Sequence, residues 1–152
     1  MSSLQLIVTQ DDWDLVQEVI QRSPGECSWL GVGTHENGIG TVTRIHFPDQ
    51  ENTSASSDID EAALADVCLD LDPDIGETVI WWGHSHGSMN TFFSGTDWAT
   101  WENWTCAKDM PFFVATVHNK KEEDPFEIVH WQGQSFPNQT GILCPEEEID
   151  ED

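Results

Sequence analysis

Two histidines separated by one residue, His84 and His86, follow a strongly apolar segment of the chain. In an extended strand, residues i and i+2 point to the same side, so both imidazoles can reach one ion. Asp97 comes eleven residues after His86, which is enough chain to turn and begin a helix. Two imidazoles and one carboxylate are a typical protein ligand set of a catalytic zinc ion, whose fourth position holds water. These residues therefore predict one zinc site per chain.

Each half of this pattern also has a structural interpretation. A His-x-His pair occurs often without a metal. Ser94 and Asp97, three residues apart, match the signature of a helix N-terminal capping box. The metal interpretation is favoured because both halves follow one apolar strand and a glutamate, Glu26, is available upstream.

The segment from His84 to Asp97 resembles the JAMM (MPN+) family of metallopeptidases. Its residues fit the family signature H-x-H-x7-S-x2-D at every defined position, with Ser94 as the serine. Gly87 stands where eukaryotic deubiquitinating members usually have proline. In this respect the chain looks more like the stand-alone members of bacteria and their phages.

The family also places a catalytic glutamate upstream, at the start of a strand of roughly the form E-x-x-G-x-L-x-G. Glu26 opens such a segment here, with Trp29 at the usual position of the first glycine. The resemblance extends from the first expected helix to the last pair of expected strands.

The resemblance implies a role for each residue. His84, His86 and Asp97 would be the zinc ligands, and Glu26 the general base for the zinc-bound water. Ser94 would orient that water or support the tetrahedral oxyanion. Such a centre works because zinc lowers the pKa of bound water to about 7, and a nearby carboxylate can act as base and then acid. The implied enzyme is a zinc metallopeptidase acting on a peptide or isopeptide bond of a protein or peptide, in this family commonly one made by a ubiquitin-like C-terminus.

Apolar periodicity predicts the elements that position these residues. Helices are expected at residues 11–22, 60–71 and 95–106, and strands at 26–33, 40–47, 77–83, 111–118 and 126–131. This alternation predicts a mixed α/β (α+β) fold around one sheet. The resemblance implies a single MPN-like domain, with a mixed sheet wrapped by about three helices in a cytidine-deaminase-like architecture. We expect that domain at residues 1–144, a mobile loop at 48–58 and a disordered acidic tail at 145–152.

The same periodicity predicts the buried side chains. The first helix should bury Leu15, Val16, Val19 and Ile20, and the second Leu64, Val67, Cys68 and Leu71. The cysteines are expected to be reduced, with Cys27, Cys68 and Cys106 in the core. Two interpretations stay open for Trp98, Trp101 and Trp104, which recur every three residues: a core stripe, or an aromatic wall along a substrate groove.

Composition restricts the partners. The 152 residues include 29 acidic and 5 basic side chains, a formal net charge of −24. This charge repels phosphate backbones and anionic bilayers, so neither nucleic acid nor membrane is an expected partner. The N-terminal residues show no signal-peptide pattern, which favours the cytoplasm. An inactive scaffold of the same fold and an acidic mimic of nucleic acid are the alternatives outside enzymes. A zinc nucleoside deaminase is disfavoured because its H-x-E and P-C-x-x-C motifs are missing.

Overall fold

The computed structural model describes residues 4–23, 25–47, 50–52, 57–59, 61–88, 91, 94–108, 111–121, 125–131, 134–135 and 140–143. They form a single mixed α+β domain. Its helices are α1 (Gln10–Arg22), α2 (Glu61–Leu69) and α3 (Gly95–Lys108), with a 3-10 turn at Pro73–Ile75. Its strands are β1 (Leu4–Ile7), β2 (Cys27–Glu36), β3 (Ile39–His46), β4 (Gln50–Asn52), β5 (Ser57–Ile59), β6 (Thr78–Ser85), β7 (Phe112–His118), β8 (Phe126–Trp131), β9 (Gln134–Ser135) and β10 (Thr140–Leu143).

Eight of these strands form one mixed sheet in the order β10-β1-β3-β2-β6-β7-β8-β9. The pairs β2–β3, β2–β6, β7–β8 and β8–β9 are antiparallel, whereas β6–β7, β1–β3 and β1–β10 are parallel. The remaining strands, β4 and β5, form a separate antiparallel pair. Strand β6, which ends in the His-x-His segment, therefore lies between two long strands in the middle of the sheet.

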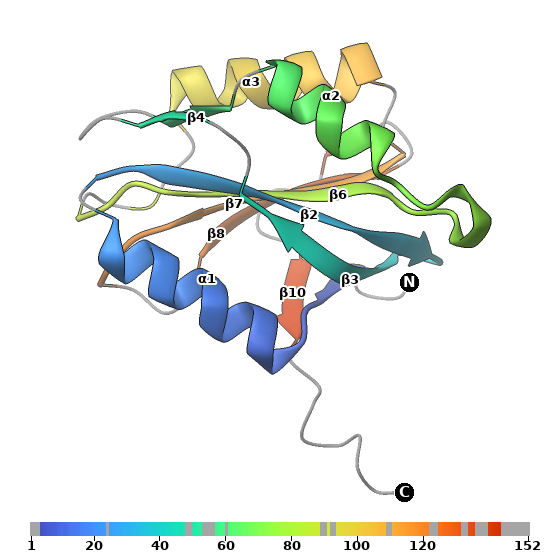
Figure 1. Cartoon of the computed structure of the whole chain (residues 1–152), viewed down its shortest axis with the longest axis horizontal. Helices are drawn as coiled ribbons and strands as arrows, with labels where there is room; N and C mark the ends of the chain where they lie inside the picture. The colour runs from blue at the N-terminus through green and yellow to red at the C-terminus, as the bar shows by residue number, and fades with distance from the viewer. Residues whose placement is uncertain are drawn as a thin grey trace, which may run out of the picture.

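Helices cover both faces of this sheet (Figure 1): α2 and α3 lie on one face and α1 lies on the other. Two separate cores result. The helix-pair core, between the sheet and α2/α3, contains Leu30, Val32, Val67, Val79, Trp82, Trp101, Phe113, Ala115, Val117 and Ile128. The α1-side core contains Leu6, Val8, Val16, Ile20, Cys27, Trp29, Val42, Ile80, Trp81, Phe112, Val114 and Val129. Trp81 and Trp82 thus face opposite sides of the sheet, as their adjacent positions predict.

Local chemistry explains where several elements begin and turn. The Oγ1 of Thr9 accepts a hydrogen bond from the Asp12 backbone N–H and caps the start of α1. Asn37 and Gly38, with φ of 56° and 82°, form the tight turn between β2 and β3. Positive φ at both central residues is typical of the type I′ hairpin, which matches the twist of the flanking strands.

Several expectations about burial and loops are wrong. Residues 48–58, expected as a loop, include β4 and the first two residues of β5, which pair as short antiparallel strands. Leu15 is 43% exposed, whereas Val16 and Ile20 of α1 are buried and Val19 packs, partly buried, against the same core. Cys68, expected in the core, is exposed on α2. Cys27 is buried as expected, and both thiols are free.

Other expectations lie outside the described residues. They concern the side chains of Leu64, Trp104 and Cys106 and the whole tail at 145–152. Within the described part of the chain, no helix is long and apolar enough to cross a membrane.

Candidate metal centre

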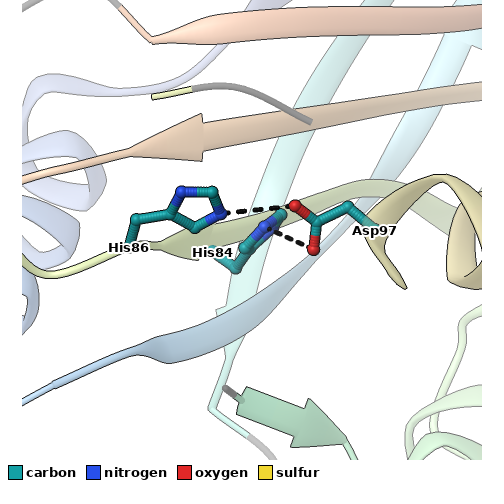
Figure 2. A group of neighbouring side chains, drawn as sticks. All are labelled: His84, His86 and Asp97. Atoms are coloured by element: carbon teal, nitrogen blue, oxygen red, sulfur yellow. Dashed lines mark hydrogen bonds and ion pairs between the residues drawn. The ribbon is translucent and has the colours of Figure 1, made fainter. Parts of the chain in front are cut away.

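The three predicted metal ligands converge where β6 ends beside the first turn of α3. Nε2 of His84 lies 3.0 Å from Oδ1 of Asp97, and Nε2 of His86 lies 3.3 Å from Oδ2 of the same carboxylate. Figure 2 shows the two imidazoles, one from the end of β6 and one from the residue just after it, pointing toward this carboxylate. One ligand atom from each residue lies within 4.8 Å of the others. His84 and His86 are 2% and 4% exposed, and the Asp97 side chain is 13% exposed.

A capping box at the start of α3 holds the Asp97 carboxylate. The Asp97 backbone N–H donates to Oγ of Ser94 at 3.1 Å, and the Ser94 backbone N–H donates to Oδ2 of Asp97 at 2.9 Å. These reciprocal bonds satisfy two N–H groups that a helix N-terminus leaves unpaired. The capping interpretation of these two residues is therefore confirmed. The same bonds direct the carboxylate toward the histidines, so the cap and the ligand site share their residues.

The chain beyond β6 remains attached to the end of β7. The His86 backbone N–H donates to the carbonyl oxygen of His118 at 2.8 Å, and the Lys120 N–H donates to that of Gly87 at 2.8 Å. Gly87 has a φ of 67°, a conformation that side chains other than glycine rarely adopt. The Gly87 N–H also donates to the buried Oγ of Ser85 at 3.0 Å. These bonds set the direction in which the chain leaves the histidines.

Glu26 immediately precedes β2, which runs antiparallel to β6. The register pairs Cys27 with Ser85 and Ser28 with His84, so its continuation places Glu26 beside His86. A Cβ on Gly87 would lie 3.4 Å from the carbonyl oxygen of Gly25, so the two segments are still adjacent beyond the paired residues. The predicted neighbourhood of the two strands is therefore confirmed. Opposed residues in a ladder point to the same face, so Ser28 shares the face of His84, and Glu26, two residues before Ser28, is only 7% exposed.

The electrostatics match the protonation states that a metal ligand needs. Burial lowers the pKa of His84, although the Asp97 carboxylate opposes this shift. Burial would raise the pKa of Asp97, but hydrogen bonds from His84 and His86 outweigh it and hold that pKa below its usual range. Neutral imidazoles and an ionised carboxylate are the metal-binding forms of these residues.

The arrangement fits a zinc ion. Zinc bonds to nitrogen and oxygen are about 2.0–2.2 Å long, so neighbouring ligands of a tetrahedral ion lie about 3.3–3.6 Å apart. In the structure, His84 and His86 contact the two different oxygens of the Asp97 carboxylate directly, at 3.0 and 3.3 Å, and one ligand atom from each of the three residues lies within 4.8 Å of the others. His84, His86 and Asp97 together are a buried group that could hold a metal ion. Three protein ligands leave one position of a tetrahedral ion for water or substrate.

Two other histidines of the described chain pack against aromatic rings. His35 stacks on Phe112 with ring centroids 5.5 Å apart, and His130 meets Trp101 edge-on at 5.7 Å. Trp101 is buried, and Trp98 packs against the helix-pair core, so the core interpretation holds for these two tryptophans.

Sequence reasoning missed two residues near the centre. His118 is buried on the α1 face, where it packs against Trp29 at 5.0 Å; burial, together with His84, lowers its pKa to about 3. Trp82 stacks on His84 with ring centroids 4.8 Å apart and an interplanar angle of 18°. The i, i+2 spacing of Trp82 and His84 was the signal for this contact, because it puts both rings on one face.

Comparisons with known proteins establish the fold but no family. No protein-family model matches the sequence, and a search of curated proteins gives no match. Among solved structures, the chain is similar to the solution structure of protein DSY2949 from Desulfitobacterium hafniense, with a TM-score of 0.66 and 12% sequence identity. The similarity covers 91% of this chain and 93% of that protein. At this identity, the likeness concerns the fold alone.

Proposed function

We propose that this protein is a zinc-dependent hydrolase of peptide or isopeptide bonds, built on a single MPN-like domain. The observation that carries the proposal is the convergence of His84, His86 and Asp97, with the buried Glu26 immediately before β2, the strand that pairs with β6. A structural cap alone explains Ser94 and Asp97 but gives no reason to bury two histidines against that carboxylate. The JAMM-like spacing of these residues adds independent support.

Each residue has a chemical task in this proposal. His84, His86 and Asp97 would hold the zinc ion, which when bound would lower the pKa of a water molecule and polarise the substrate carbonyl. Glu26 would accept the proton of the attacking water and pass it to the leaving amine. Its burial beside the ligands suits that task, because electrostatic interactions are stronger in a site that excludes water. Ser94 would use its hydroxyl group to support the developing oxyanion.

The proposed substrate is a protein or peptide with an accessible carbonyl group. In the resembling family, the bond commonly joins a ubiquitin-like C-terminus to the amine of a lysine, and we extend this substrate class to the present chain. The formal charge of −24 favours partners that are neutral or cationic over anionic ones.

A reporter assay with the purified protein tests the proposal. Linear peptides and lysine ε-amine isopeptides, each with a fluorescent leaving group, are incubated with the zinc-loaded protein, with and without 1,10-phenanthroline. We expect hydrolysis of at least one class, its loss with the chelator, and its return when zinc is added back. Stoichiometric zinc without hydrolysis of either class would contradict the enzyme and favour a binding module of the same fold.

A further inference from the structure

The indole of Trp82 lies nearly parallel to the imidazole of His84, a candidate metal ligand. It stacks on the His84 imidazole at 4.8 Å, with the two planes 18° apart. The contact between the two ligand rings is different, because His84 and His86 are 5.2 Å apart and tilted by 54°. Trp82 therefore covers one face of the His84 imidazole, while Nε2, at the edge of that ring, points at Asp97.

The orientation of the His84 ring decides whether this ligand can bind. Rotation about χ2 of a histidine is broad and roughly two-fold, so the backbone alone does not fix the plane of the imidazole. In the structure, that plane directs Nε2 to within 3.0 Å of the Asp97 carboxylate. A quarter turn about χ2 would drive the edge of the imidazole into the indole face and turn Nε2 away. Close packing at this distance is therefore a constraint on ring rotation.

Trp82 can supply this constraint because its own position is fixed. It is 3% exposed and belongs to the helix-pair core. Its neighbours across the ladders are Leu30 on β2 and the small Ala115 on β7. A large ring between a branched side chain and a methyl group has few alternative rotamers in a close-packed core.

We propose that Trp82 is a positioning residue of the metal centre: its indole face holds the His84 imidazole in the plane that turns Nε2 toward Asp97 and His86. The inference rests on the proposed zinc site but not on the reaction that the site performs. Surroundings that orient a metal-binding histidine typically change metal affinity by about 10-fold to 100-fold when they are removed. Trp82 would do so through its aromatic face.

Four variants separate positioning from packing. Trp82→Phe keeps an aromatic face, whereas Trp82→Leu and Trp82→Met keep apolar bulk without one. Phe113→Leu is the matched control, because it removes a fully buried aromatic ring from the same core without altering Trp82. Zinc affinity is measured by competition with a chromophoric chelator. The visible spectrum of cobalt(II) bound in place of zinc reports the ligand geometry, and thermal unfolding of each metal-free protein reports the fold.

We expect Trp82→Leu and Trp82→Met to bind zinc about 10-fold to 100-fold more weakly than wild type and to shift the cobalt(II) bands. Trp82→Phe should retain the affinity and the spectrum. Phe113→Leu should unfold at a lower temperature but bind both metals as wild type does. Wild-type affinity and spectrum in the non-aromatic variants, or an equal loss in Phe113→Leu, would overturn the positioning role. Failure of the wild-type protein to bind zinc would instead overturn the metal centre itself.

Discussion

The backbone N–H of His86 donates a 2.8 Å hydrogen bond to the carbonyl oxygen of His118, one residue beyond the end of β6. This bond extends the parallel pairing of β6 with β7. On the other side of β6, the pairing with β2 reaches Cys27, which lies opposite Ser85. The backbone of the second histidine of the motif is therefore attached to the end of β7, although the chain turns immediately afterwards.

Loss of either kind of ligand should remove the metal. We expect His84→Ala and Asp97→Asn to lose stoichiometric zinc, because only His84, His86 and Asp97 converge within the described chain. Elemental analysis of the purified variants measures this. His35→Ala is the control, since His35 packs on Phe112. Zinc should also raise the unfolding temperature of the wild type, because a ligand that binds the folded state alone stabilises it. Full zinc occupancy in either ligand variant would refute the assignment.

Ser94 should affect stability and turnover separately. Ser94→Ala removes the hydroxyl that accepts the Asp97 N–H, so we expect a loss of about 1 kcal/mol in unfolding free energy. If the hydroxyl also supports the oxyanion, turnover falls by about 10² to 10³. Ser94→Asn restores a capping side chain without the hydroxyl, and it should recover the stability but not the rate. Unchanged turnover in both variants would leave Ser94 as a helix cap only.

The ligand geometry was predictable because it depends on local rules. The i, i+2 spacing of His84 and His86 places both rings on one face of any strand, and Ser94 with Asp97 encodes a capping box independently of tertiary context. The pairing of β2 with β6 followed from the need to bring Glu26 to the same place. Predicting the stack of Trp82 on His84 would have required knowing where the strand ends. Strand β6 extends to Ser85 and so includes His84, whereas the expected strand ended at residue 83.

Elements that depend on distant partners could not be predicted. Strand β1 pairs in parallel with β10, where Leu4 lies opposite Thr140. Such short segments carry too few residues to show a period, and their stability comes from the pairing itself. The antiparallel pair of β4 and β5 lies in a polar segment without alternation. The exposure of Leu15 and Cys68 likewise depends on how much of each helix surface the sheet covers. The sequence of a helix alone does not determine that width.

The ion pair between Arg44 and Glu77, just before β6, should make the free energy of unfolding depend on pH in the acidic range. Hydrogen bonds from Arg44, helped by one from Thr43, lower the pKa of Glu77 from 4.5 to about 2. A carboxyl group whose pKa is lower in the folded state stabilises the fold above the unfolded pKa and loses this contribution as pH falls. We expect Glu77→Gln to cost about 1–3 kcal/mol at pH 7. The difference from wild type should shrink between about pH 4.5 and pH 2.

Chemical denaturation of both proteins across this pH range measures that difference. Glu36→Gln, which changes an exposed glutamate at the far end of β2, is the control and should show no such trend. A pH-independent difference between Glu77→Gln and wild type would show that the ionised carboxylate does not supply the stabilisation.

Salt should stabilise the whole protein. A formal charge of −24 on 152 residues creates self-repulsion in the compact state. The screening length falls from about 30 Å at 0.01 M salt to about 3 Å at 1 M. We expect the unfolding temperature to rise over this range of sodium chloride at pH 7, and to rise less at pH 4, where many carboxylates are protonated. An unfolding temperature that is constant or falls with salt at pH 7 would contradict this prediction.

The activity of Glu26→Gln tests the proposed hydrolase most directly. Glutamine keeps the size of the side chain and a hydrogen-bonding oxygen but cannot accept the proton of water at neutral pH. Wild type, Glu26→Gln and the control Glu36→Gln are compared for zinc content and for the rate at which new N-termini appear in a proteome-derived peptide library. We predict equal zinc in all three proteins, wild-type cleavage by Glu36→Gln, and a loss of at least about 10² in the rate for Glu26→Gln. Cleavage by Glu26→Gln at the wild-type rate would contradict the proposed mechanism.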